Sequence, residues 1–129
     1  MTAVRYYSRS GNTKLLAEAI AEAAGVPAVS VDTPEAPITE ETDVLFIGGA
    51  LYAYGLDRKM KDYLAGIDGS KVKKAVVFST SWLSKHSLDL LKNGLEAKGI
   101  AVEPETLYAK NKPDEAKLAE AKSFAAKFI

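Results

Sequence analysis

Short, continuously apolar segments alternate along this chain with segments whose apolar residues recur at helical spacing. Residues 44–47 (Val-Leu-Phe-Ile) and 75–78 (Ala-Val-Val-Phe) contain no polar member, which is typical of central parallel strands that helices cover on both faces. Residues 14–24 place leucine, isoleucine and alanine at helical spacing before a Gly-x-Pro stop. The alternation predicts a doubly wound α/β fold, in which a parallel sheet is sandwiched between helices.

The same patterns assign an element order to the whole chain, which we read as a single domain over residues 1–129. Strands are predicted at 4–7, 26–31, 43–47, 74–79 and 100–108, and helices at 14–24, 56–66, 87–98 and 114–128. Residues 32–42 contain two prolines and several acids without apolar periodicity, which predicts a surface connector. A five-stranded parallel sheet with helices on both faces follows.

Composition narrows the functions that such a domain can perform. The 17 Lys and Arg balance the 17 Asp and Glu, and no continuous basic face appears, so we expect no nucleic-acid binding. The absence of cysteine excludes disulfides, thiolate nucleophiles and iron–sulfur clusters. Redox chemistry would therefore need an organic cofactor, and we expect no metal site.

The cellular setting is predicted from the amino terminus and from hydropathy. The first residues do not form a charged leader followed by an apolar stretch, and no apolar run is long enough to span a bilayer. We therefore expect a cytoplasmic protein that does not contact membranes, and we expect a monomer.

In open parallel sheets, ligands bind outside the carboxyl ends of the strands. Three predicted loops lie there, at residues 8–13, 48–55 and 79–84. The first loop (residues 8–13) joins a strand to a helix, so hydroxyls, an amide and backbone N–H groups meet at a helix N-terminus that favours an anion such as a phosphate monoester. Its candidate ligands are Ser8, Arg9, Ser10, Gly11, Asn12 and Thr13.

The residues of the first loop also have structural interpretations that need no phosphate, and the sequence leaves them open. Asn12 or Thr13 would cap the helix and the serines would fill a tight turn. Arg9 would pair with a phosphate, with carboxylates of a partner, or with solvent.

The first loop contains neither Gly-x-Gly-x-x-Gly nor the Lys-Ser or Lys-Thr of nucleoside triphosphatases, which weakens dinucleotide and triphosphate binding. Its sequence Ser8-x-Ser10-Gly11-Asn12-Thr13 resembles the flavodoxin family, whose first loop wraps the phosphate of flavin mononucleotide (FMN). The resemblance extends to the element order of the whole chain. It implies a flavodoxin-like fold with FMN as cofactor.

The resemblance also implies that the two other segments contact the flavin. Tyr54-Gly55 is similar to an aromatic-glycine pair beside the isoalloxazine, where the ring stacks and the glycine peptide reorients to accept a hydrogen bond from N5 of the reduced flavin. The family commonly has a glycine-containing, often acidic segment where this chain has Trp82-Leu83-Ser84-Lys85-His86. These aromatic residues also have structural interpretations without a flavin. Tyr52 and Tyr54 would pack under the next helix, and Trp82 would anchor its loop. The implied ligands are Ala50, Leu51, Tyr52, Ala53, Tyr54 and Gly55, followed by Ser79, Thr80, Ser81 and Trp82.

The function implied is that of an FMN-dependent electron carrier that meets redox partner proteins in transient contacts and needs no catalytic side chain. An NAD(P)H-dependent FMN or quinone reductase on the same scaffold is the alternative. A response-regulator receiver, a flavin-free module with the same strand order, would require clustered aspartates that bind magnesium at the ends of its first and third strands. These positions are Tyr7-Ser8 and Ile47-Gly48 here, which argues against a receiver. His86, the only histidine, is interpreted as a solvated surface residue.

Overall fold

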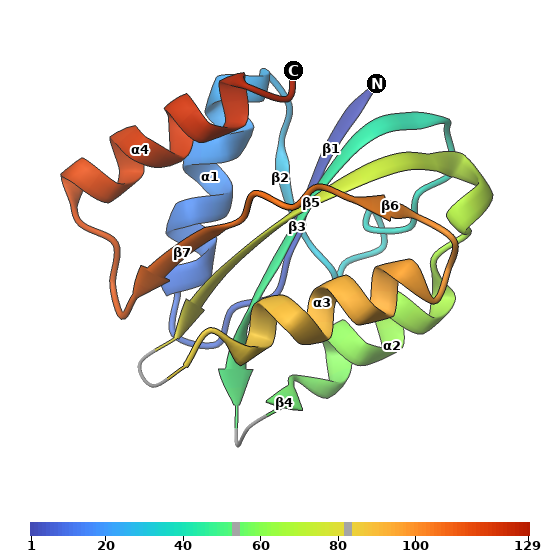
Figure 1. Cartoon of the computed structure of the whole chain (residues 1–129), viewed down its shortest axis with the longest axis horizontal. Coiled ribbons are helices and arrows are strands. Elements are labelled where there is room, and N and C mark those ends of the chain that lie inside the picture. Colours follow the sequence, from blue (N-terminus) through green and yellow to red (C-terminus); the bar gives the residue numbers. More distant parts are fainter. Residues whose placement is uncertain (53–54, 82–83) are drawn as a thin grey trace.

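The computed structural model describes residues 1–52, 55–81 and 84–129, in which strands and helices alternate (Figure 1). The predicted helices are all present, with ends shifted by no more than a few residues. The elements are β1 (Thr2–Tyr6), α1 (Asn12–Ala24), β2 (Ala28–Ser30), β3 (Thr42–Tyr52), β4 (Gly55–Leu56), α2 (Arg58–Gly66), the short 3₁₀ helix η1 (Gly69–Lys71), β5 (Val72–Ser81), α3 (His86–Glu96), β6 (Ala101–Val102), β7 (Leu107–Lys110) and α4 (Glu115–Ala126).

The sheet follows the order β2-β1-β3-β5-β6, with β7 also pairing with β5 and with every pair along this path parallel. The chain leaves β1 for the outer strand β2 and then crosses back to β3 on the other side. The order of connections therefore reverses between β1 and β3, and such a switch point opens a crevice at the carboxyl ends of these strands.

The sheet contains seven strands where five were predicted. Residues predicted as one last strand form two, β6 and β7, which both pair with β5. Pro104 lies between them and has no N–H to donate to a ladder. The other additional strand, β4, forms an antiparallel pair with the end of β3. The doubly wound α/β architecture is confirmed.

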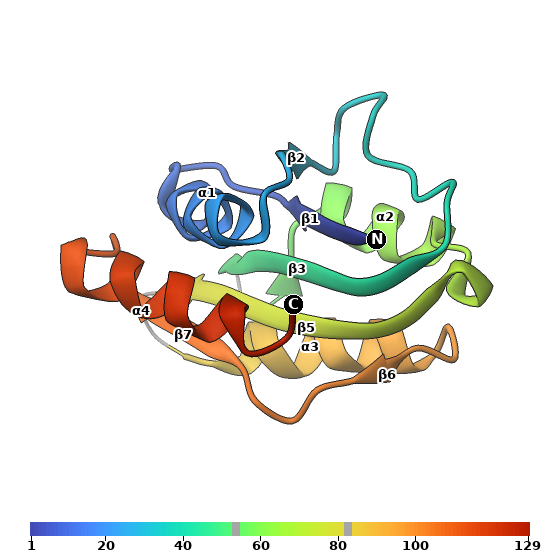
Figure 2. The same cartoon turned by 90° about the horizontal axis from the view of Figure 1, so that it is seen from above.

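Two apolar layers hold the sheet between pairs of helices, as the two views show (Figures 1 and 2). Val44 and Phe46 of β3 pack in the layer under α1 and α4, whereas Leu45 and Ile47 pack in the layer under α2 and α3. Successive strand residues point to opposite faces, so a strand covered on both faces must be apolar at every position. This explains the unbroken apolar runs.

β3 and β5 extend further than predicted. Residues 48–52 and 79–81, which were predicted to lie in the loops 48–55 and 79–84, belong to these two strands, so the loop prediction was wrong for them. Gly48–Ala50 pair in register with Phe78–Thr80. Gly48 is required in this extension because a Cβ there would lie 2.6 Å from Cζ of the buried Phe78 ring, and closer to two other ring carbons. Both strands thus carry their residues into the region where a ligand was expected.

Residues 32–41 form the predicted irregular connector and contain no helix or strand. The buried carbonyl of Ala36 accepts hydrogen bonds from Arg5 Nε, at 2.7 Å, and from the Tyr63 hydroxyl, at 2.5 Å. Arg5 itself is buried within β1. These two donors fix the connector against the α2 face of the sheet without regular structure of its own. In the described part of the chain, no helix is long and apolar enough to cross a membrane.

Candidate functional site

The first loop is a turn that leads from β1 into α1. Gly11 has φ 93° and is the N-cap residue of α1, a left-handed conformation that glycine adopts without steric cost. Its amide donates to Ser8 Oγ at 2.9 Å, and the Asn12 amide donates to Ser10 Oγ at 3.5 Å. The serine hydroxyls therefore stabilise the turn, as one of the interpretations from the sequence proposed.

The N-terminus of α1 has no side-chain cap, because its N-cap residue is a glycine. The first turn of the helix contains no acidic residue. Amides in a first helical turn have no acceptor within the helix, and together with the macrodipole they attract an anion. The end of α1 therefore has the electrostatic character of an anion site.

Thr13 and Thr80 form a buried pair of hydroxyl groups. Their Oγ1 atoms lie 2.6 Å apart, and the residues are only 1% and 3% exposed. Thr80 faces α1 because residues alternate along β5, on which Phe78 also faces α1. The contact joins the first turn of α1 to a strand 67 residues later in the chain. Thr13 therefore links elements and does not cap the helix.

Arg9 is engaged within the molecule. Its Nε donates to Asp57 Oδ2 at 2.8 Å and its Nη2 donates to the same oxygen, while the guanidinium carbon lies 3.9 Å from the centre of the Tyr52 ring. The Arg9 amide donates to the Tyr52 hydroxyl at 3.0 Å. We call this arrangement of Arg9, Tyr52 and Asp57 the Arg9 clamp. It ties the first loop to the end of β3 and to the start of α2.

Asp57 provides the buried end of the clamp. It is the N-cap residue of α2 and its Oδ1 accepts the Lys59 amide at 2.8 Å. Burial alone would raise the pKa of this carboxyl, but the Lys59 amide and the Arg9 guanidinium outweigh burial and hold the pKa below its usual value. Asp57 is therefore ionised at neutral pH, and its charge offsets that of Arg9.

The second predicted segment is a strand pair. Ala50, Leu51 and Tyr52 end β3, and Leu51 and Tyr52 pair with Leu56 and Gly55 of β4. Ala53 and Tyr54 lie outside the described residues. Tyr52 is half-buried, and burial is the main reason that the pKa of its hydroxyl is raised. The structure therefore places Tyr52 beside the first loop.

The third predicted segment is the end of β5 and divides between the two faces of the sheet. The Ser79 hydroxyl lies 2.5 Å from the Gly49 carbonyl oxygen and 2.5 Å from Ser87 Oγ of α3, so it faces away from Thr80 and the first loop. Ser81 is buried, and its carbonyl accepts the Tyr108 hydroxyl at 2.8 Å. Trp82 lies outside the described residues. Thr80 is the member of this segment that contacts the first loop.

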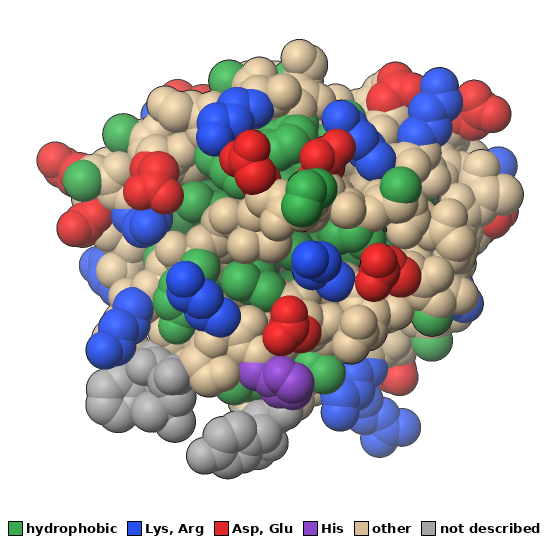
Figure 3. Space-filling view, in the orientation of Figure 1, with side chains coloured by type: hydrophobic (Ala, Val, Ile, Leu, Met, Phe, Trp, Pro, Cys, Tyr) green, Lys and Arg blue, Asp and Glu red, His purple; other side chains and the backbone are tan. Residues whose placement is uncertain are grey.

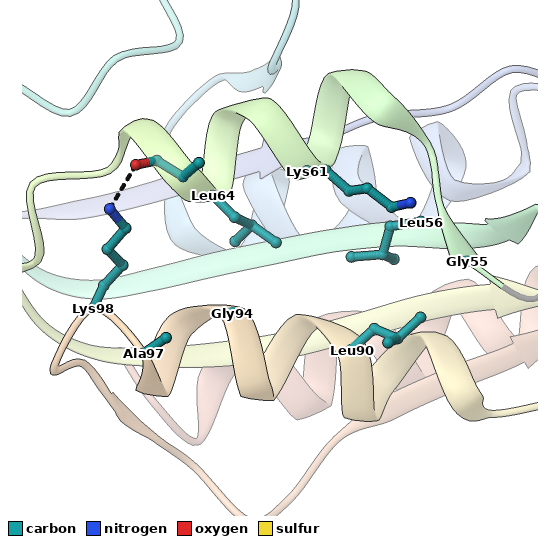
Figure 4. A pocket seen from close by; sticks show the side chains of 9 residues that line it. Gly55, Leu56, Lys61, Leu64, Leu90, Gly94, Ala97 and Lys98 are labelled. Atoms are coloured by element: carbon teal, nitrogen blue, oxygen red, sulfur yellow. Dashed lines mark hydrogen bonds between the residues drawn. The ribbon is translucent and has the colours of Figure 1, made fainter.

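A separate groove of about 510 Å³ runs between α2 and α3 (Figure 4). Leu56, Leu64 and Leu90 form its apolar walls, and Lys98 Nζ donates to the Ala65 carbonyl at its edge. No residue of the first loop lines it. The groove and the anion site are different features of the surface.

No protein-family model matches the sequence, and no curated protein matches it either. Solved structures, in contrast, superpose on nearly the whole chain. An archaeal flavodoxin is 23% identical with a TM-score of 0.88, and the match covers 99% of this chain and 96% of that one. Flavodoxin 1 from Bacillus cereus is 24% identical with a TM-score of 0.82 over 98% and 95% of the two chains. The chain has the flavodoxin fold.

The flavodoxin fold also occurs as one part of longer proteins. Rubredoxin oxygen:oxidoreductase from Desulfovibrio gigas is 18% identical with a TM-score of 0.84, and the match covers 98% of this chain but 34% of that one. A fold that is shared by whole proteins and by parts of larger ones does not determine the activity. Function must be argued from the site.

Sequence reasoning missed Asp57, which completes the Arg9 clamp on the flavodoxin fold. An aspartate directly before a helical segment is a signal for an N-cap, so its place at the start of α2 could have been found. Its pairing with a residue 48 positions away could not. His86 begins α3 and is exposed, as interpreted. Among the described residues, no group of three acidic or histidine side chains could hold a metal ion.

Proposed function

We propose that the chain binds FMN with its phosphate at the first loop, and that it transfers electrons between partner proteins. One observation carries the proposal: the uncapped N-terminus of α1, preceded by a hydroxyl-rich turn, lies at the switch point of the sheet. Helix N-termini at this position in open α/β sheets bind phosphate groups. The similar solved structures include flavodoxins from an archaeon and from Bacillus cereus.

The donor set fits a phosphate monoester. The first loop offers backbone amides, the hydroxyl of Ser10 and the side-chain amide of Asn12, and Asp57 is already bound by Arg9. The first loop, residues 8–13, contains no Asp or Glu that would repel a phosphate. The attraction for the phosphate then comes from oriented dipoles and neutral donors, while the charge of Arg9 is used to hold the loop.

The rest of the cofactor would lie between the end of β3 and the end of β5. Bound FMN would supply the redox chemistry, because it takes up and releases electrons at its ring. The chain would orient the ring with Tyr52, which the Arg9 clamp holds at the edge of the first loop. The Thr13–Thr80 pair would fix the distance between the phosphate site and β5. None of these groups needs to act as an acid or base, which favours a carrier over an enzyme.

Titration of the purified protein with FMN and with riboflavin tests the phosphate site directly. We expect flavin fluorescence to be quenched at a 1:1 ratio, and FMN to bind at least about tenfold more tightly than riboflavin, because charge-assisted hydrogen bonds contribute about 1.5–3 kcal/mol each. Ser10→Ala should weaken FMN binding but leave riboflavin binding unchanged. Ser123→Ala on α4, where the serine is also exposed, is the matched control and should change neither affinity.

Three outcomes would contradict parts of the proposal. No binding of either flavin at micromolar concentrations would mean that the first loop is only a helix start. Equal affinities would place the flavin elsewhere. Steady oxidation of NAD(P)H with a quinone present would replace the carrier by an NAD(P)H-dependent FMN or quinone reductase.

A further inference from the structure

The groove between α2 and α3 is apolar along most of its length. Leu56 and Leu64 are 6% exposed, and the partly buried Leu90 of α3 points toward them (Figure 4). The other uncharged residues that line the groove are small: Gly55, Ala65, Gly94 and Ala97. Its volume of about 510 Å³ lies within the range of small-molecule sites, about 300–1,000 Å³. The groove can therefore accept the apolar part of a small ligand.

The charged residues that line the groove are two lysines at its opposite ends (Figure 4). Lys98 is engaged, because its Nζ donates to the carbonyl of Ala65, near the C-terminus of α2, at 2.5 Å. Lys61 has neither an ion pair nor a side-chain hydrogen bond with any described residue. A Cβ at Gly55 would lie 3.5 Å from Lys61 Nζ. The free ammonium therefore lies over the backbone of Gly55, at one end of the groove.

Acidic side chains of the two helices lie outside the groove. They are Asp62, Asp89 and Glu96, and none of them lines it. Asp62 lines a separate pocket, and Asp57, the N-cap residue of α2, is bound by Arg9. Among the described residues, no carboxylate that lines the groove would therefore repel an anion at Lys61.

The direction of the two helices distinguishes the ends of the groove. α2 and α3 run the same way along it, and their N-terminal halves lie at the end where Lys61 meets Gly55 (Figure 4). The helix macrodipoles favour negative charge at that end and positive charge at the other, where Lys98 lies. From Leu90 to Ala97 the groove follows α3 for about 10 Å. An anion at Lys61 would thus leave this apolar length for the rest of the same molecule.

We propose that the groove binds an amphiphilic carboxylate, with the carboxylate at Lys61 and an unbranched hydrocarbon chain against the three leucines. Medium-chain fatty acids fit this description, since the extended chain of decanoate is of similar length to the apolar stretch. An exposed ion pair contributes little by itself. The chain therefore supplies most of the affinity through burial, and Lys61 fixes the direction of binding. This site goes beyond the proposed function and does not rest on it.

Calorimetric titration of the flavin-free protein with octanoate, decanoate and decanol, below their micelle concentrations, tests the proposal. Because the groove is open on one side, each methylene is buried in part and should raise the affinity about twofold, so decanoate should bind about fourfold more tightly than octanoate. Decanol carries no charge and should bind about two- to fivefold more weakly than decanoate. Lys61→Gln should remove this difference. Lys112→Gln, which removes an exposed lysine outside the groove, should keep it.

A second pair of variants tests where the chain lies. Ala97→Phe places a large side chain in the groove from an exposed position and should weaken decanoate binding at least about tenfold, because it excludes several methylenes. Ala119→Phe, at an exposed position of α4, is the matched control and should leave the affinity unchanged. In amide NMR spectra of the wild type, decanoate should shift the signals of residues 61–65 and 90–98.

Four outcomes would overturn the proposal. Equal binding of decanoate and decanol by the wild type would mean that the groove has no anion site. Equal affinity of Ala97→Phe and the wild type would mean that the fatty acid adsorbs elsewhere. Groove signals that shift when the protein alone is concentrated would assign the groove to a second copy of this chain. Displacement of decanoate by FMN would assign it to the flavin, whereas a failure to bind FMN at all would refute the proposed function alone.

The groove is separate from the other exposed face of α3. Figure 3 shows acidic and basic side chains interspersed over the face of the molecule that it draws. The proposal therefore depends on the residues that line the groove and not on the charge of the surrounding surface.

Discussion

The Thr13–Thr80 hydroxyl pair gives the sharpest test of how α1 is held at the sheet. Thr80→Val keeps the shape of the side chain and leaves the Thr13 hydroxyl without its partner in a site that is 1–3% exposed. An unsatisfied buried hydroxyl costs about 1–3 kcal/mol. For a domain of this size, that loss corresponds to a fall in melting temperature of about 4–11 °C.

The double variant Thr13→Val, Thr80→Val removes both polar groups together. It should recover most of the stability, because replacing both partners of a buried hydrogen bond by apolar groups of equal shape is nearly neutral. Urea unfolding of the wild type, the two single variants and the double variant gives the free energy of unfolding for each. The expected coupling energy between the two positions is about 1–2 kcal/mol.

Two results would refute this reasoning. If each single variant loses less than about 0.5 kcal/mol, the hydroxyl groups find other partners or water. If the double variant loses the sum of the two single losses, the two residues contribute independently and the contact between α1 and β5 is incidental. The FMN affinity of Thr80→Val should fall less than that of Thr13→Val, since Thr13 alone belongs to the first loop.

Other substitutions test single features of the fold and site. Gly48→Ala should lose about 2–3 kcal/mol of unfolding free energy, because its Cβ would overlap the Phe78 ring, whereas Gly66→Ala, with open space around it, should change by less than about 1 kcal/mol; thermal unfolding measures both. Gly11→Ala should cost about 1–2 kcal/mol because of its left-handed φ, and should weaken FMN more than riboflavin in fluorescence titrations. Asp57→Asn keeps an N-cap but removes the ion pair. Because the pKa of Asp57 is lowered in the folded state, its stabilisation is present above the ordinary carboxyl pKa, about 3.9, and is lost below it. The difference in free energy of unfolding between the wild type and Asp57→Asn, measured by urea unfolding, should be constant from pH 5 to 8 and should disappear below about pH 4. A difference that grows on acidification would contradict a lowered pKa of Asp57.

Local patterns were sufficient to predict the α/β architecture. Apolar runs and helical spacing depend on neighbouring residues, so both buried strands and all four helices of the described chain could be read directly. The division of the last strand followed from Pro104, a local signal that the sequence analysis did not use. The extension of β3 through Gly48 and Gly49 was harder to predict from the sequence, because glycines usually end strands, whereas here Gly48 permits close packing against Phe78.

Contacts within the candidate site depend on residues far apart in the chain. The sequence indicated an anion site at the first loop, but Arg9 had three open interpretations. Its partner lies at the start of α2, 48 residues away, and only the folded sheet brings the two together. The same holds for Thr13, for which capping was as reasonable as the observed contact with β5. A short motif therefore identified the loop, and the long-range contacts assigned the roles within it.

Pairing determines which charges on this molecule can act on other molecules. Arg9 belongs to the first loop, yet Asp57 binds its guanidinium, so we expect its contribution to phosphate affinity to be small and its contribution to loop geometry to be large. If Arg9 acted through its charge alone, removing Asp57 would strengthen FMN binding. Under the proposed function we expect no such gain, because neutral donors of the first loop would hold the phosphate and Asp57 keeps Arg9, and with it the loop, in place.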